Sequence, residues 1–219
     1  MDIKKILNAV AFAFKSFRAS FAFGKTTDEL FEAFEGALRN ELGEYEIVYD
    51  YIWGKDTLNI DGQTKGYTPR MGDTLIMDIS VGKNGVWCDV CRTYFVGEPS
   101  LEQRESYALI CESLSNGHRA LKIGARACDV YVAVNKTFEG AGKSLVHHAG
   151  HAIGEAPLMQ PQFLKENETA LGQGFYTVET GLYSSFGMRV ENDFILSENG
   201  AEDLFEELLP LDIKEYILV

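Results

Sequence analysis

Four acidic residues lie inside stretches that otherwise have the apolar composition of buried strands. Asp78 lies in "LIMDIS" and Asp89 in "WCDVCR", while Glu179 follows "FYTV" and Glu191 follows "GMRV". A carboxylate among apolar strand residues is costly unless it is paired, protonated or bound to a metal ion. Whatever fold the chain adopts must therefore compensate four such groups.

Two explanations of these acids are open from the residues alone. Each acid can face outward or form a salt bridge, with Arg92 and Arg189 as basic partners. Alternatively, all four can share one cation site with a histidine of "VHHAGHAIGEAPL", residues 146–158. Four carboxylates and one imidazole exceed the needs of a single tetrahedral zinc ion. Two divalent ions that share bridging carboxylates fit such a set better.

Alternating polarity and turn residues predict two strand hairpins. "DTLIMDIS" and "VWCDVCRTYFV" flank the turn "VGKNG", and "GFYTVETGLY" pairs with "GMRVENDFILS". Helices are predicted for residues 102–123 and for the opening segment, where Ile6, Val10, Phe14 and Phe17 repeat at helical spacing. The chain is therefore predicted to be an α+β protein, with helices flanking a curved, mainly antiparallel sheet.

A faint internal repeat indicates two similar halves. "GKTTDELFEAFEGALRNELG" aligns with "GARACDVYVAVNKTFEGAG", and each ends at a glycine, Gly43 or Gly142. A short apolar stretch follows each copy, "EIVYDYIWG" or "SLVHHAG". We expect halves of about 1–97 and 98–219, packed as one domain over 1–219, with no separate N-terminal domain.

The overall charge narrows the classes of partner. The chain has a formal net charge of −13 and a pI of about 4.7, which disfavours nucleic acid and anionic membranes as partners. The apolar run 6–14 contains Asn8 and is followed by Lys15, so it is too short and too polar to span a bilayer. A cytoplasmic protein is therefore expected.

Cys88 and Cys91 form a CxxC pattern, which can indicate a redox pair or half of a zinc site. In a strand, however, these two side chains would point to opposite faces. No second CxxC accompanies them. Buried free thiols are the favoured interpretation.

Five motifs occur in the order found in the pita-bread metallopeptidases: "GDTLIMDIS", "CDVCRTYFVG", "GHAIG", "TVETGLY" and "GMRVENDFILSENGAEDL". The chain closely resembles this family over roughly residues 5–212. Members include methionine aminopeptidase, Xaa-Pro aminopeptidase, prolidase and the non-peptidase creatinase. Asp89 follows Asp78 at the family's spacing, and Arg189 in "GMRVEND" resembles the proline-peptidase and creatinase branches.

The resemblance implies a pita-bread fold around two divalent ions (Mn, Co, Zn or Fe). It implies that Asp89 and Glu191 bridge the ions and that Glu179 also handles the proton of the attacking water. His147 would be a catalytic and substrate-contacting imidazole, and Arg189 a substrate contact. The implied activity is that of an Xaa-Pro-type aminopeptidase or dipeptidase on small peptides, in a homodimer. The complete set of implied metal ligands is Asp78, Asp89, His151, Glu179 and Glu191.

The chain departs from the family pattern at three places. Asp61 occupies a position where the family has a histidine, and a carboxylate cannot donate a hydrogen bond at neutral pH. Gly154 runs directly into "EAP", so Leu158 stands where a second histidine is expected. In the family this second imidazole helps to stabilise the tetrahedral intermediate. Loss of one hydrogen-bond donor of this kind typically lowers the reaction rate by a factor on the order of 10²–10³. The usual "EPG" is "ETG", a mild change in the stiffness of a turn.

These departures keep two other functions open. One is a catalytically impaired metal-binding or peptide-binding protein of the same fold, and the other is a creatinase-like C–N hydrolase. Among the remaining residues, His148 is expected on the opposite strand face from His147, His118 on a solvated helix, and Tyr183 as a packed aromatic.

Overall fold

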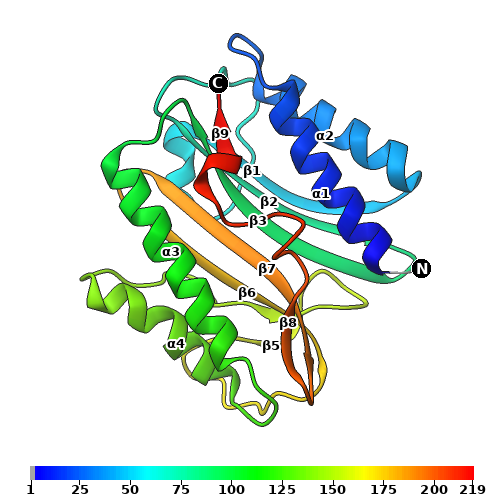
Figure 1. Ribbon diagram of the computed structural model, residues 1–219, viewed down its shortest axis with the longest axis vertical. Coiled ribbons are helices and arrows are strands. Elements are labelled where there is room, and N and C mark those ends of the chain that lie inside the picture. The colour runs from blue at the N-terminus through cyan, green and yellow to red at the C-terminus, as the bar shows by residue number, and fades with distance from the viewer. Residues whose placement is uncertain (1–2) are drawn as a thin grey trace.

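Nine strands form one sheet in residues 3–219, the part of the chain that the computed structural model describes (Figure 1). Seven of them follow the order β1-β2-β3-β7-β6-β4-β5, while β8 pairs with β7 and β9 with β3. All neighbours are antiparallel except β3 and β9. The strands are β1 (Glu46–Trp53), β2 (Thr74–Lys83), β3 (Val86–Val96), β4 (His151–Ala152), β5 (Met159–Gln162), β6 (Gly174–Tyr183), β7 (Gly187–Ser197), β8 (Gly200–Asp203) and β9 (Ile217–Leu218).

Two pairs of helices cover one face of this sheet, one pair from each half of the chain (Figure 1). Helix α1 packs on β2 and β3, and α3 packs on β6 and β7. Each pair precedes a strand hairpin in the sequence, so the order of helices and hairpin occurs twice. The helices are α1 (Ile3–Ser20), α2 (Thr27–Leu42), α3 (Leu101–Ala120) and α4 (Ala127–Gly140), with short 3₁₀ helices at η1 (Gly54–Leu58) and η2 (Ile213–Tyr216).

Local chemistry sets where the helices begin and end. Thr26 and Glu29 form a capping box at the start of α2, and Ser100 and Gln103 form one at the start of α3. Helix α2 ends at Gly43, whose φ of 70° is one that residues with a side chain rarely adopt. These signals fix the helix ends, and the apolar faces then decide how the helices lie on the sheet.

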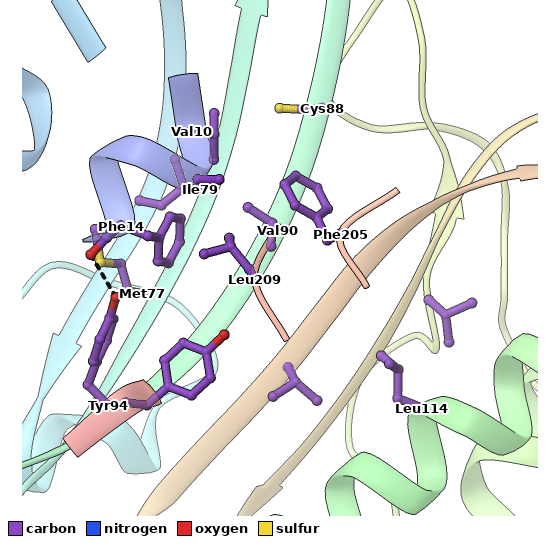
Figure 2. Close-up of a cluster of buried hydrophobic side chains, with 14 of the residues drawn as sticks. Val10, Phe14, Met77, Ile79, Cys88, Val90, Tyr94, Leu114, Phe205 and Leu209 are labelled. Atoms are coloured by element: carbon purple, nitrogen blue, oxygen red, sulfur yellow. Dashed lines mark hydrogen bonds between the residues drawn. The ribbon is translucent and has the colours of Figure 1, made fainter. Parts of the chain in front are cut away.

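The face of α1 that helical spacing predicts is the face that is buried. Val10 and Phe14 lie over Met77, Ile79 and Val90 of the first hairpin (Figure 2). The hydroxyl of Tyr94 donates a hydrogen bond to the carbonyl of Phe14, at 3.0 Å, and so ties the helix to β3. The predicted opening helix is confirmed, and its four predicted core residues are fully buried: Ile6, Val10, Phe14 and Phe17.

The two halves meet where β3 crosses β7, at the centre of the sheet (Figure 1). A single residue pair, Cys91 with Glu191, aligns there. Arg92 is fully buried beside this pair, and its guanidinium donates to the carbonyls of Cys91, Glu191 and Leu209 at 2.7–2.8 Å. Hydrogen bonds from side chains to backbone carbonyls therefore help to hold β3 and β7 together, where backbone pairing between the two strands is short.

Both predicted hairpins are present, β2 with β3 and β6 with β7. The segment "SLVHHAG" (144–150) differs from its expected apolar-strand character, because it is irregular and its turns are set by individual hydrogen bonds. The helix expected over 102–123 ends at Ala120. Among residues 3–219, no helix is both long and apolar enough to cross a bilayer.

Replacing Phe14 by alanine should lower the free energy of unfolding by about 3–5 kcal/mol, because it removes a buried ring and leaves a cavity. Phe12 lies on the same helix but is 49% exposed, so Phe12→Ala is the matched control and should cost less than about 0.5 kcal/mol. Urea unfolding of both variants measures the difference. Equal losses would contradict the assignment of the buried face.

Candidate metal centre

The structure brings together all five residues that the resemblance implies as metal ligands. They come from five strands: Asp78 from β2, Asp89 from β3, His151 from β4, Glu179 from β6 and Glu191 from β7. Asp89, His151 and Glu191 form one group whose ligand atoms all lie within 4.8 Å of one another. Asp78, Glu179 and Glu191 form a second group of the same kind. Glu191 belongs to both groups.

Strand register explains how distant acids converge. Asp78 faces Cys91 across β2 and β3, Cys91 faces Glu191 across β3 and β7, and Glu191 faces Glu179 across β7 and β6. Residues that face each other in antiparallel strands project from the same side of the sheet. Asp89 lies two residues from Cys91 and therefore projects from that side too. The four acids thus share the face of the sheet opposite the helices.

Gly150 sets the position of His151. Its φ is +125°, and a Cβ atom there would lie 2.2 Å from the carbonyl oxygen of Thr177, so only glycine fits. The backbone N–H of His151 then donates to Thr177 Oγ1 at 3.2 Å, which holds the short strand β4 beside β6.

The ring of His151 is oriented as a metal ligand would be. Its Nδ1 lies 2.9 Å from the carbonyl oxygen of Ala152, so the ring proton sits on Nδ1. The other ring nitrogen, Nε2, then has a free lone pair and faces the two acids. It lies 3.7 Å from Asp89 Oδ2 and 3.8 Å from Glu191 Oε1. A backbone carbonyl that fixes the tautomer in this way is the usual outer partner of a metal-binding histidine.

Two of the buried acids, Asp89 and Glu191, have no arginine or lysine partner within the described residues. Burial, together with the neighbouring carboxylates, raises the pKa of Asp89 and of Glu191 well above the ordinary range. One oxygen of each, Asp89 Oδ1 and Glu191 Oε1, is buried without a hydrogen-bond partner in that part of the chain. Divalent cations would satisfy both oxygens, and the mixture of carboxylates with one imidazole suits Mn, Co, Zn or Fe. The residues therefore fit a metal centre.

The contacts of Arg189 show how far salt bridges compensate the four acids, which was the alternative explanation. Its guanidinium Nη1 lies 2.8 Å from Asp78 Oδ2 and 3.2 Å from Glu179 Oε1, and Nη2 donates to the carbonyl of Ile60. These contacts compensate two of the four acids. Arg92, the other basic candidate, lies on the helix side of the sheet and binds Tyr216 there.

The histidines before His151 are arranged differently from expectation. His147 Nδ1 lies 3.4 Å from Glu179 Oε1, and His148 Nδ1 lies 3.2 Å from Glu179 Oε2. The expectation that His148 turns to an opposite strand face is wrong, because residues 144–150 form no strand and both rings reach the same glutamate. Side chains alternate between two faces only in a strand, so that rule does not predict their direction in an irregular segment.

A cleft of about 380 Å³ gives access to these groups. Its inner wall holds the five candidate ligands with Arg189, His147 and His148. Its mouth is lined by acidic and apolar side chains of β1 and of two loops: Val48, Tyr49, Asp50, Ile60, Asp61, Pro157 and Leu158. The cleft therefore combines a polar floor with a partly apolar entrance.

The other sequence candidates are not part of the cleft lining. Cys88 is buried in the core beneath the helices and Cys91 in a separate small cluster, so the CxxC thiols are free and on different faces, as expected. His118 is not freely solvated, because its Nε2 bonds the carbonyl of Ala201 at 2.8 Å. Tyr183 packs edge-on against His147, in agreement with its prediction.

Residues 2–198 match the family model of metallopeptidase family M24. The chain belongs to this family. The match spans both hairpins and all five candidate ligands, so the resemblance seen in the motifs extends through the whole site.

The relatives of this M24 chain include a proline peptidase. It is 30% identical to the Xaa-Pro dipeptidase of Pyrococcus furiosus over 138 residues, which are 61% of this chain and 40% of that protein. It is 27% identical to an uncharacterized peptidase of Methanocaldococcus jannaschii over 198 residues, 80% of this chain and 56% of the other. The chain thus spans about half the length of these relatives.

Solved structures confirm the predicted fold. The prolidase from Pyrococcus furiosus superposes with a TM-score of 0.86 at 24% identity, covering 92% of this chain and 62% of that one. The X-Pro aminopeptidase from Thermotoga maritima gives 0.85 at 25% identity, covering 92% and 60%. The pita-bread fold predicted from the motifs is therefore correct.

Neutral isosteres at the buried acids should have opposite effects on metal affinity and on metal-free stability. In the presence of a chelator, Asp89→Asn and Glu191→Gln should each raise the free energy of unfolding at neutral pH, because the amide needs no proton whereas the buried carboxyl, whose pKa is raised, must take one up on folding. Both should weaken Mn²⁺ binding at least about tenfold. Glu166→Gln, at an exposed position, is the control. Unchanged Mn²⁺ affinity in calorimetry would refute the site.

Gly150→Ala should destabilise the protein by about 1–3 kcal/mol and weaken Mn²⁺ binding, because the added Cβ displaces β4 and with it His151. Gly172→Ala is the matched control, since no heavy atom lies within 4 Å of its Cβ position. Thermal unfolding and Mn²⁺ titration report the two effects. A Gly150 variant that equals its control in both would show that the close approach is unimportant.

Proposed function

We propose that this chain is the catalytic part of a metal-dependent exopeptidase that hydrolyses small peptides, with Xaa-Pro dipeptides as the leading substrate class. One observation carries the proposal: four carboxylates and an imidazole converge on an open cleft in which buried carboxylate oxygens lack partners among the described residues. Family membership and the relatives' names, Xaa-Pro dipeptidase and prolidase, support a peptide bond as the target.

The candidate ligands would hold two divalent ions, with Asp89 and Glu191 shared between them. Membership of Glu191 in both groups of ligand atoms supports its bridging role. When bound, such ions supply positive charge that lowers the pKa of a water molecule and polarises a carbonyl group. Arg189 positions Asp78 and Glu179 through its ion pairs, a role that we propose in place of direct substrate contact.

Glu179 is placed to hold and move the proton of the reaction. Burial alone would raise the pKa of Glu179, but the charges of His147, His148 and Arg189 lower it, so the group is ionised and can accept a proton. The water oxygen adds to the carbonyl carbon while its proton passes to Glu179. The same proton then goes to the leaving nitrogen as the C–N bond breaks.

The cleft entrance supports a short, apolar peptide. Val48 and Leu158, each about half exposed, offer apolar surface in the lining of the cleft. Asp50 and Asp61 add negative charge at the same rim, which would attract the free amino group of a dipeptide. His147 has a buried Nε2 without a partner among residues 3–219, and we propose it as a second contact for the bound peptide.

A peptide-binding protein of the same fold is the second candidate. Two observations favour it: Asp61 and Leu158 stand at the rim where the family has histidines, and neither can donate a hydrogen bond at neutral pH. Such a protein would bind metal and peptide through the same floor but turn over slowly.

Protein stripped of metal and reloaded separately with Mn²⁺, Co²⁺, Zn²⁺ or Fe²⁺ should hydrolyse Xaa-Pro dipeptides, and chelation should abolish the activity. Glu179→Gln should lower kcat by about 10²–10⁴, because it removes the proton acceptor, whereas Glu166→Gln should not change kcat. A screen of dipeptides with metal analysis of each sample is the measurement. Stoichiometric metal without turnover of any peptide would instead support the binding protein.

A further inference from the structure

Asp193 is a buried acid that has no part in the proposed reaction. It is 1% exposed, and a carboxyl group in such a place is costly unless the fold uses it. It is not among the residues that line the cleft, and neither group of converging ligand atoms includes it. Its role must therefore be sought in what its side chain holds.

Strand register brings Asp193 close to Asp89. The aligned pair of β3 and β7 is Cys91 with Glu191. Two residues further along each strand, an unbroken ladder would set Asp89 opposite Asp193. The pairing does not extend that far. The backbone carbonyl of Asp193 instead accepts the N–H of Leu204, at 2.9 Å, just beyond the end of β8.

The side chain of Asp193 replaces the missing backbone pairing. The backbone N–H of Asp89 donates to Asp193 Oδ2 at 2.9 Å, and this bond is buried. A buried N–H without an acceptor is costly, so the position of Asp89 is tied to this carboxyl group. One oxygen of a carboxyl group can accept whether or not the other carries a proton. The bond is therefore independent of the ionisation of Asp193.

Thr93 shows the same kind of replacement on the other side of the aligned pair. Its Oγ1 donates to the carbonyl of Arg189 and accepts the N–H of the same residue, both at 2.8 Å. Side chains therefore take over from backbone pairing on both sides of Cys91 and Glu191. Of the Thr93 and Asp193 bonds, only the second ends on a proposed metal ligand.

Asp193 thus connects the two acids that we propose as bridging ligands. It follows Glu191 by two residues on β7, and its side chain holds the backbone of Asp89 on β3. The two ligands belong to different hairpins, so the turn of neither hairpin fixes their separation. A hydrogen bond between the hairpins at this point limits how far the two ligands can move apart.

We propose that Asp193 is a positioning residue, whose hydrogen bond to Asp89 sets the spacing of the two bridging carboxylates and thereby the affinity of the centre for divalent metal. This inference rests on the proposed function, because it concerns the same metal centre. In this role Asp193 contacts neither metal nor substrate and transfers no proton. Outer groups that orient a ligand in this way typically account for about 10–100-fold in metal affinity.

The test measures Mn²⁺ binding to the full chain by calorimetry. Asp193→Ala should weaken Mn²⁺ affinity by about 10–100-fold, because Asp89 loses the group that holds it. Asp193→Asn keeps an acceptor oxygen and should stay within about threefold of the wild type. Asp193→Leu keeps the branched shape without an acceptor and should lose affinity as the alanine variant does. The contrast between leucine and asparagine therefore tests the bond without a cavity, even if Asp193→Ala does not fold.

Asn192→Ala is the matched control. Asn192 is the preceding residue of β7 and is equally buried, but its amide donates to Asp203 Oδ2 on β8, at 2.7 Å, and not to β3. Its loss should lower the free energy of unfolding while leaving Mn²⁺ affinity unchanged. An equal loss of affinity in Asn192→Ala and Asp193→Ala would mean that general destabilisation weakens the site, and would overturn the proposed role.

Amide hydrogen exchange gives a readout that needs neither metal nor turnover. In metal-free protein with ¹⁵N-labelled aspartate, the Asp89 amide should exchange at least about tenfold faster in Asp193→Ala than in Asp193→Asn. Asn192→Ala should leave this rate at the wild-type value. An Asp89 amide that exchanges equally fast in all of these proteins would contradict the hydrogen bond to Asp193.

The outcomes separate this role from the proposed function. Wild-type protein that binds Mn²⁺ but turns over no peptide would refute the peptidase proposal, while selective loss of Mn²⁺ affinity in Asp193→Ala would still support the positioning role. Unchanged Mn²⁺ affinity in both Asp193→Ala and Asp193→Leu would overturn the positioning role and leave the peptidase proposal intact. Wild-type protein that binds no Mn²⁺ would refute both.

Discussion

The pairing of β3 with β7 is the constraint on which the candidate centre depends. One aligned pair, Cys91 with Glu191, joins the two hairpins, and the hydrogen bonds of Arg92 and Thr93 to β7 secure it. A slip of one residue there would turn every side chain of one hairpin to the other face. The acids of one half would then point into the helices while those of the other half still faced the cleft.

Much of the fold follows from local patterns in the sequence. The period of two in "LIMDIS" and "GMRVENDFILS" identifies strands, and the apolar spacing from Ile6 to Phe17 identifies a helix, because both are properties of neighbouring residues. The sequence also indicated four of the converging residues, since each acid interrupts an apolar run, and the family resemblance implied His151 as the fifth. Nothing local indicates that Cys91 faces Glu191, because that register depends on contacts between halves.

Two features of the site lie beyond such reasoning. His148 lies two residues before Gly150, whose φ is +125°, in a segment with no regular period, so the direction of its ring depends on single backbone angles. Arg189 has a long side chain that can reach several acids, and only the packed sheet decides that it meets Asp78 and Glu179. Irregular backbone and long side chains are where sequence patterns carry least information.

Arg189 has a consequence for the sign of the electrostatic potential in the cleft. Carboxylates bind metal ions in their ionised form, and with Asp78, Asp89, Glu179 and Glu191 all ionised the four acids and this one guanidinium carry a formal charge of −3. Two divalent ions carry four positive charges, so a site loaded with both would have a net formal charge of +1. Because burial raises the pKa of Asp89 and of Glu191, the metal-free floor holds back part of this negative charge. The loaded floor would carry a net positive charge and would attract the carboxylate end of a peptide, even though the protein is acidic overall.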